Sequence, residues 1–250
     1  MKTIELKVKK LFGIRSFRVD FPERISEMTE RQFVALVALS RGSLSVEEFY
    51  ASFLGVDTDL LRELDGYALW MLGGLFERLD RQRGVDGVSS FFIPRLRVYH
   101  SPDEKLHGMS FQQFMMIDTY SSWYTVSGRA EYLDQMIAAM YLKEGYSYFP
   151  EKDETLVDFD TSIEDLSQIH IDVKMAVFIN WNLIRQWLSA TFPYLFPKGD
   201  GNDAKGRSAA AWLDIFDAFV GDNIPHMDEY KKLPCMDAFR ILNRKIKNSK

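Results

Sequence analysis

The segment from Ile171 to Phe192 places the strongest constraint on how this chain folds. Its spacing predicts one long helix, with apolar side chains on nearly every face and a proline at 193 to end it. A helix that is apolar all round must be covered by other elements. The segment therefore predicts a multi-helix core with this helix at its centre and with Trp181 and Trp187 buried in it.

Capping patterns and apolar periodicity predict several further helices. Sequences of the capping-box type, in which two side chains satisfy backbone donors at a helix start, occur at 29–32, 45–48 and 110–113. A long helical stretch is expected over 57–79, with Gly73 and Gly74 inside it as a kink or a close packing point. Further helices are expected at 130–141 and 209–220, and a last helix from Pro234 to Ile246.

The first 22 residues have a different period. Ile4, Leu6 and Val8 alternate with polar residues, and an apolar alternation resumes after Gly13 and continues to Phe21. This pattern is typical of two half-buried strands joined as a β-hairpin. Because a lone hairpin is marginally stable, its apolar face must pack on helices or on a partner chain.

These elements predict a mainly α (α+β) fold, a multi-helix globular domain with an N-terminal β-hairpin. The expected organisation is a hairpin at 1–22, an N-terminal helical half at 23–83, an irregular connection at 84–108 and a C-terminal helical half at 109–250. The two halves can also form one continuous domain. The Gly-rich and charged segment 198–208 is expected to be the most mobile internal loop.

Charge is distributed unevenly along the chain. Residues 1–18 carry six basic residues and one acidic residue, and residues 237–250 carry five and one, whereas the whole chain has 31 Lys+Arg and 36 Asp+Glu. The acidic middle makes nucleic-acid binding unlikely, because it repels phosphates. The basic end of the last helix is expected to bind an acidic protein partner or the chain's own acidic middle, through Arg240, Arg244, Lys245 and Lys247. The alternative is that the two basic ends are a solvated strand and a frayed helix end.

The sequence also bears on the compartment. The longest run of apolar residues and glycine, Ala68 to Phe76, is far shorter than the ~20 residues of a membrane span, and the N-terminus has no apolar stretch typical of a secretion signal. The single cysteine, Cys235, fits a reducing compartment. We therefore expect no membrane partner and a location in the cytoplasm.

Motifs that carry chemistry are sparse, so no catalytic residue and no cofactor is predicted. The sequence has no phosphate-binding GxxxxGK[ST], no HExxH and no CxxC pair. Asp158 and Asp160 are candidates to share a divalent cation, although the cluster around them, with Glu164 and Asp165, equally suits the first turn of a helix beginning near Thr161. Cys235 is placed near a helix N-terminus, where the helix dipole lowers the pKa of a thiol.

Aromatic residues gather between positions 123 and 149. Trp123 and Tyr124 are the candidates for partner binding, because such rings are enriched at interfaces. The alternative is an aromatic-rich core. Stacking of bases or sugars on these rings is disfavoured, because few basic residues interleave there.

Two runs, Met109-Ser110-Phe111…Phe114…Asp118-Thr119-Tyr120 and 132–141, resemble an uncharacterised group of Bacteroidetes phage and prophage proteins. That group begins with a short β segment and continues with helices, and its genes sit in virion or tail modules. The resemblance covers about 90 residues and carries no catalytic motif. The chain departs from the pattern at 140–143, which lacks the expected Arg-Pro. The resemblance implies a structural or assembly role, and a location in the cytoplasm of a host cell or in a virion.

Three functions follow as hypotheses. The first is a non-enzymatic, phage-like structural or tail-assembly protein that acts through protein–protein contacts, as a homo-oligomer or with other virion proteins. The second is an adaptor or regulatory protein that binds a small ligand or a host protein. The third is an enzyme with an acidic divalent-metal site.

Overall fold

The computed structural model describes residues 1–10, 13–81, 88–197 and 209–249. Its internal contacts divide the chain into two compact units, Met1–Val88 and Ser89–Lys250. The boundary falls inside the expected connection 84–108, but residues 89–108 belong to the second unit, where they form short strands and turns. The expected loop at 198–208 lies outside the described residues. The mainly α fold class with an N-terminal hairpin is confirmed.

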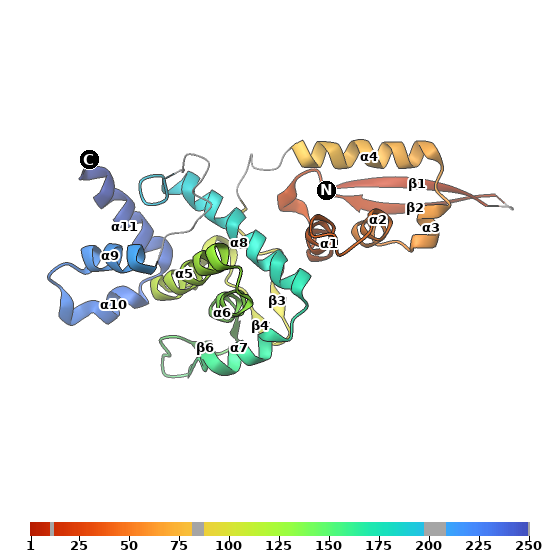
Figure 1. Ribbon diagram of the computed structural model, residues 1–250. Coiled ribbons are helices and arrows are strands. Elements are labelled where there is room, and N and C mark those ends of the chain that lie inside the picture. Colours follow the sequence, from red (N-terminus) through yellow and green to blue (C-terminus); the bar gives the residue numbers. More distant parts are fainter. Residues whose placement is uncertain (11–12, 82–87, 198–208, 250) are drawn as a thin grey trace. The chain divides into compact units, whose positions relative to one another are not determined.

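The N-terminal unit is a β-hairpin followed by helices (Figure 1). The two strands pair antiparallel, from Lys2 opposite Phe21 to Lys10 opposite Gly13, as the alternation predicts. The longest helix of this unit runs alongside the hairpin in Figure 1. The elements are β1 (Lys2–Lys10), β2 (Gly13–Phe21), η1 (Ile25–Glu27), α1 (Glu30–Ser40), α2 (Val46–Leu54), α3 (Thr58–Arg62) and α4 (Gly66–Arg81).

Helices of the same unit cover the apolar face of the hairpin. Ile4 and Leu6 of β1 are buried. The Phe21 ring of β2 lies 5.6 Å from Phe53 of α2 and 4.9 Å from Phe76 of α4, between ring centroids. These rings hold the hairpin by burial of apolar area, the dominant favourable term in folding. The hairpin is expected to pack either on helices or on a partner chain. Among the described residues, helices of the same unit cover its apolar face.

Local capping explains where the helices of this unit begin. The capping boxes predicted at Thr29 and Ser45 are confirmed at the starts of α1 and α2. The single helical stretch expected over 57–79 is wrong, because Asp57 caps only the short α3. Asp65 Oδ1 then accepts a hydrogen bond from the backbone N–H of Ala68 at 2.8 Å, and α4 begins at Gly66.

The C-terminal unit is a helical body with a small three-stranded sheet and a small two-stranded sheet at its edge (Figure 1). Its helices are η2 (Glu104–Leu106), α5 (Phe111–Ser127), α6 (Ala130–Met140), α7 (Phe159–Ser167), α8 (Ile171–Thr191), α9 (Ala209–Val220), η3 (Ile224–His226), α10 (Met227–Lys232) and α11 (Cys235–Asn248). Its strands are β3 (Arg95–Leu96), β4 (Tyr99–His100), β5 (Leu142–Lys143), β6 (Tyr146–Ser147) and β7 (Thr155–Leu156). None of the helices described in either unit combines the length and apolar character of a membrane span.

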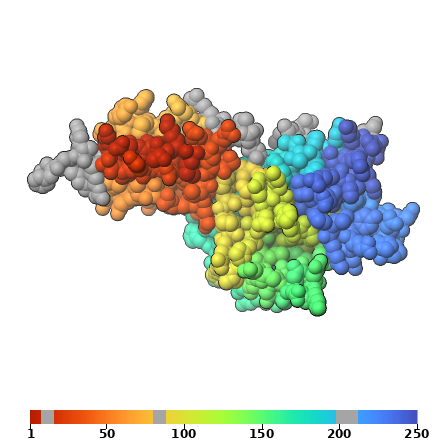
Figure 2. Space-filling view, turned by 180° about the vertical axis from the view of Figure 1, so that it is seen from behind, coloured from red at the N-terminus to blue at the C-terminus, as the bar shows by residue number. Residues whose placement is uncertain are grey.

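The helix α5 lies at the centre of this unit and packs against α6, α9, α10 and α11. Its Phe114 ring lies 5.4 Å from Trp181 of α8, 5.4 Å from Trp212 of α9 and 4.6 Å from Phe239 of α11, between centroids. The segments α9 to α11 form the continuous blue part of the surface in Figure 2. One aromatic cluster therefore joins four helices that are far apart in the sequence.

The long helix α8 has the expected bounds but is less central than its composition predicts. Trp181 is fully buried, whereas Trp187 is only half-buried, so the expected burial of both tryptophans holds for Trp181 alone. Val173, Phe178 and Leu183 are also half-buried. The outer side of α8 is covered only in part, and α5 takes the central position instead.

The third predicted capping box is half right. Ser110 Oγ accepts the backbone N–H of Gln113 at 3.1 Å, as the pattern requires. The Gln113 amide does not return to Ser110, because its Nε2 donates to Ala139 O of α6 at 2.9 Å. A tertiary contact between α5 and α6 has replaced the local one.

The burial of Trp181 gives a test of this core. We expect Trp181→Ala to lower the free energy of unfolding by about 3–5 kcal/mol, because it leaves a cavity against Phe114. Guanidinium unfolding followed by circular dichroism measures it. Trp123→Ala is the matched control, since Trp123 is 39% exposed and its loss removes less buried area. Equal effects of the two substitutions would contradict the assignment of Trp181 to the core.

Candidate functional site

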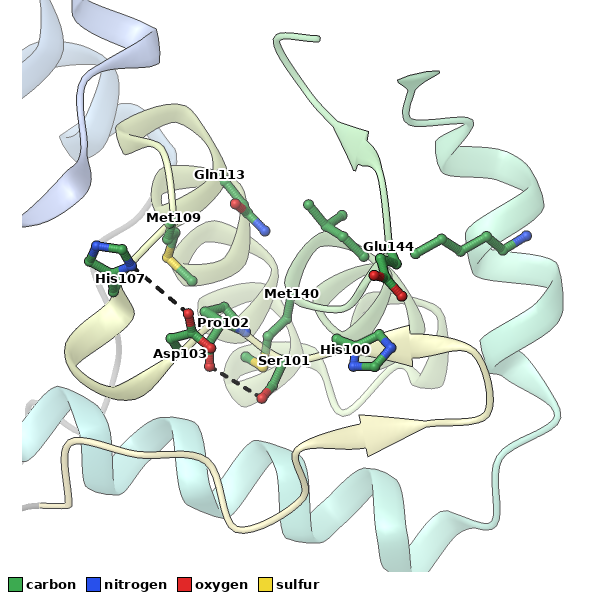
Figure 3. Close-up of a pocket in the computed structure, with 12 residues that line it drawn as sticks. His100, Ser101, Pro102, Asp103, His107, Met109, Gln113, Met140 and Glu144 are labelled. Atoms are coloured by element: carbon green, nitrogen blue, oxygen red, sulfur yellow. Dashed lines mark hydrogen bonds and ion pairs between the residues drawn. The ribbon is translucent and has the colours of Figure 1, made fainter. Parts of the chain in front are cut away.

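A cavity of about 400 Å³ opens on the C-terminal unit where β4, the η2 turn and β5 meet the start of α5. Its floor is apolar, since Met109 and Met140 are buried, and the buried Gln113 adds an amide. Its rim is charged. In Figure 3, His107 and Asp103 lie on one side of the cavity, and His100 and Glu144 lie on the other. The remaining lining residues are Ser101, Pro102, Gly108, Leu142 and Lys143.

Segments next to the cavity contain backbone in an uncommon conformation. Arg97, Lys105 and Leu106 have φ of 56°, 58° and 58°, in the left-handed region that non-glycine residues seldom adopt. Tertiary contacts hold this turn in place. The Lys105 N–H donates to Ser89 O at 2.7 Å, and the Leu106 side chain is buried. Strain of this kind persists only where the surroundings fix it, and it often marks a binding site.

A polar cluster adjoins the cavity at Lys143. The Tyr99 hydroxyl donates to Asp165 Oδ2 at 2.6 Å, and Lys143 Nζ lies 3.3 Å from the same oxygen. The Lys143 ammonium also lies 4.9 Å from the centre of the Tyr99 ring. The Tyr99 hydrogen bond and then the Lys143 charge lower the pKa of the Asp165 carboxyl. Burial, followed by the bond to Asp165, raises the pKa of Tyr99.

This arrangement suits binding better than catalysis. The rim presents two imidazoles and two carboxylates to solvent, and the contact of His107 Nδ1 with Asp103 Oδ2 at 3.9 Å is highly exposed and therefore weak. The hydroxyl of Ser101 donates to Pro102 O at 3.2 Å. The cavity therefore offers an apolar floor and a polar rim to a small molecule that carries both kinds of surface.

The two aspartates proposed as metal ligands lie at a helix start. Asp158 caps α7, accepting the backbone N–H of Thr161 at 3.1 Å and its hydroxyl at 2.8 Å, and Asp160 is exposed in the first turn. Within the described ranges, no three His, Cys, Asp or Glu residues gather as a metal site. The helix begins earlier than expected, so Asp165 lies in its last turn and bonds Tyr99 instead of the helix N-terminus.

The cysteine has the opposite property to the one expected from its place at a helix start. Cys235 is completely buried at the beginning of α11, and its thiol lies 3.8 Å from Leu106 O. Burial raises its pKa to about 12, which outweighs the favourable helix N-terminus. The prediction of a lowered pKa is therefore wrong.

The two aromatic candidates for partner binding differ in exposure. Tyr124 packs inside the unit, with its hydroxyl 3.1 Å from Met175 S and its ring 4.9 Å from Phe178. Trp123 is 39% exposed and rests on Tyr120 and Tyr132, at 5.6 and 5.2 Å between centroids. Only Trp123 presents its ring to the surface of this unit.

The four basic residues proposed for partner binding all lie on the exposed side of α11. The opposite side is buried through Ala238, Phe239 and Leu242. The basic residues do not form one uniform row. Arg240 pairs with Asp237 of its own helix at 2.8 Å, Lys245 donates to Phe219 O at 3.4 Å, and Lys247 lies 5.8 Å from the Tyr194 ring centre, while Arg244 is exposed.

The most exposed aromatic residues of the N-terminal unit were not among the sequence candidates. Tyr67 and Trp70 of α4 are 70% and 74% exposed, with ring centroids 6.0 Å apart. Leu69 of the same helix is 46% exposed. The available signal was that Tyr67 and Trp70 fall outside the apolar stripe of Ala68, Leu72 and Leu79, three positions apart on the opposite face.

Comparison of the chain with protein-family models, with curated proteins and with solved structures gives no match. The phage resemblance therefore remains an expectation from the sequence, and the function has to be argued from the residues.

The polar cluster at Asp165 predicts a pH-dependent effect on stability. Because its pKa is lowered in the folded state, the charged carboxylate stabilises the fold above its ordinary pKa of about 3.9, and this contribution disappears as the pH falls. We expect Asp165→Asn to lower the unfolding free energy at pH 7 and the difference from the parent to narrow below about pH 4. Urea unfolding at several pH values measures it. Asp153→Asn, at an exposed carboxylate, should show no such narrowing.

The burial of Cys235 predicts an unreactive thiol. A thiol with a pKa of about 12 is almost entirely protonated at pH 8, and only the thiolate attacks alkylating reagents. Iodoacetamide should therefore label the native protein very slowly and the urea-unfolded protein rapidly, as followed by mass spectrometry. Rapid labelling of the native protein would contradict the burial.

Proposed function

We propose that this chain is a non-enzymatic structural or assembly protein that acts through protein–protein contacts, as expected for a virion or tail module of a phage-like particle. The observation that carries the proposal is the aromatic pair Tyr67 and Trp70 on the outer face of α4. Both rings are more than two-thirds exposed. Tyrosine and tryptophan are the residues most enriched where proteins bind one another.

The fold of the N-terminal unit does not account for the two rings. The opposite side of α4 provides its core contacts through Ala68, Leu72 and Leu79, which are buried. Leaving a tryptophan in water forgoes ~1.5–3 kcal/mol or more of hydrophobic stabilisation. A protein partner that covers Tyr67 and Trp70 recovers this free energy, and the rings stand close enough to fill one pocket or groove.

The charge distribution supports contacts between protein chains. The exposed residues Arg244 and Lys247 of α11 belong to one of the two basic ends of a chain whose middle is acidic. Opposite charges of this kind guide association and fix its orientation more than they add affinity. Charge at one surface and aromatic anchors at another fit a protein that contacts several neighbours in an assembly.

The cavity of the C-terminal unit favours a second function, an adaptor that binds a small ligand. Its apolar floor at Met109 and Met140 and its histidine and carboxylate rim suit a small amphipathic molecule. An experiment can distinguish the two functions. A ligand that binds this cavity raises the melting temperature of the monomeric chain by mass action, without any association between chains.

The proposed function predicts that the chain forms defined multimers that depend on the exposed rings. Sedimentation velocity of the full chain should show species larger than the monomer, and Tyr67→Ser with Trp70→Ser should return it to the monomer without lowering its melting temperature. The control is Val126→Ser, which changes an apolar residue that is 69% exposed on α5. A parent chain that stays monomeric up to about 100 µM, or multimers that survive the double substitution, would contradict the proposal.

A further inference from the structure

We propose that the outer face of α4 is covered by α4 of a second copy of this chain, with the two helices packed antiparallel about a two-fold axis and each Trp70 seated on Gly74 of the other copy. This inference rests on the proposed function and names the partner for its aromatic pair. It is carried by the two glycines, by the order of residues along the exposed face and by the charges at its two ends.

Nothing in the described chain requires glycine in the middle of α4. A Cβ added at Gly73 or at Gly74 meets no atom within 4 Å, and neither residue has a positive φ. Glycine weakens a helix interior relative to alanine, because it loses more backbone entropy on folding. The two glycines therefore lower the stability of α4, and no contact within the described N-terminal unit compensates for this loss. The two glycines are explained if another helix packs closely against the flat surface that they form.

The exposed face of α4 carries both halves of a self-complementary contact. Its exposed residues include Tyr67, Trp70, Gly74 and Arg78, in this order along the helix, with Leu69 and Glu77 exposed beside them. Trp70 and Gly74 are four positions apart, so the bulky ring and the flat glycine lie one above the other on the same face. An isologous two-fold contact needs one surface that contains both a protrusion and its seat. An axis at the level of Leu72 places each Trp70 opposite Gly74 of the other copy.

The same axis also brings together complementary groups at the helix ends. Asp65 precedes α4, and its side chain caps the helix N-terminus, while Arg78 is exposed near the C-terminus. In the antiparallel pair, Arg78 of one copy lies beside Asp65 and the Tyr67 ring of the other. An arginine gains from a carboxylate and from an aromatic face. A parallel pair instead sets Arg78 against Arg78 and aligns the two helix dipoles unfavourably.

A second copy fits these observations better than an unrelated partner. A different protein must supply a seat for Trp70, a protrusion for Gly74 and a carboxylate for Arg78, all at matching spacing. A second copy supplies all three at once, because Trp70 and Gly74 lie on the exposed face of its α4 and Asp65 lies at the N-terminus of that helix.

The sharpest test is Gly74→Leu with Gly73→Leu as its matched control. Both changes replace a glycine of the same helix that has open space at its Cβ, so both should preserve or raise the melting temperature. Only Gly74 lies on the exposed stripe with Trp70, whereas Gly73 is turned to its side and is half-exposed. We expect Gly74→Leu to weaken the dimer at least about tenfold in sedimentation equilibrium and Gly73→Leu to leave it near the parent value.

The outcomes separate this inference from the proposed function. If Tyr67→Ser with Trp70→Ser abolishes association while Gly74→Leu leaves it unchanged, the two-fold packing is wrong and the proposed function stands. If none of these variants changes association, both are wrong. If the effect of these substitutions does not depend on protein concentration, the two-fold packing is also wrong, because the surface that covers α4 then belongs to the same chain.

A disulfide trap tests the antiparallel direction. Gly66 has open space at its Cβ, and the axis places it opposite Arg78 of the other copy. Chains with Gly66→Cys and chains with Arg78→Cys, distinguishable by mass, should form the mixed disulfide in preference to either homodimer after mild oxidation. The native Cys235 is buried and stays out of this reaction. Predominant disulfides between two copies of Gly66→Cys would show a parallel pair and overturn the proposal.

Discussion

Much of the C-terminal unit depends on one buried charge, the carboxylate of Asp118 in α5. Its side chain is almost wholly removed from solvent, and each of its oxygens has a different partner. Arg185 Nε of α8 lies 2.9 Å from Oδ1, and Trp212 Nε1 of α9 donates to Oδ2 at 2.7 Å. Removing one partner of a buried ion pair costs about 3–5 kcal/mol, so the three helices are held at one axial position relative to each other. Phe114, one turn earlier on α5, contacts Trp181 of α8 and Trp212 of α9, so its aromatic contacts join the same three helices.

Irregular segments of the same unit are held by side chains that bond to backbone groups. Asn180 of α8 accepts the N–H of Phe92 at 2.7 Å and donates to Ser90 O at 3.1 Å. Tyr141 donates to Ile93 O at 2.7 Å. Each bond satisfies a backbone group that lies outside any strand or helix, and an unsatisfied buried group costs ~1–3 kcal/mol. The left-handed turn next to the cavity is bonded to the same segment, because the Lys105 N–H donates to Ser89 O.

These two features mark what the sequence predicts and what it leaves open. Capping at Thr29 and Ser45, the hairpin alternation and the bounds of α8 depend on neighbours within a few positions, and they can be predicted. The ion pair of Asp118 and the anchoring by Asn180 join residues far apart in the chain, and no local pattern announces them. Gln113 shows the competition directly, because the local box and the bond to Ala139 O need the same amide, and the tertiary bond wins.

The candidate sites follow the same division. The pKa of Cys235 was misjudged because the helix start is visible in the sequence, whereas the burial that outweighs it is a property of the folded unit. The exposed pair on α4 was missed for a related reason. A break at residues 63–65 sets the rotation of α4 about its axis, and this rotation decides that Ala68 faces the core and Trp70 faces away from it. Once the break is known, the pattern of α4 has a consistent interpretation. One face carries the apolar residues that the fold needs, and the other carries the aromatic rings and the glycine. Glycine in the middle of a helix costs about 1 kcal/mol of stability relative to alanine. Because this cost brings no gain in folding, it favours a function of this face in binding.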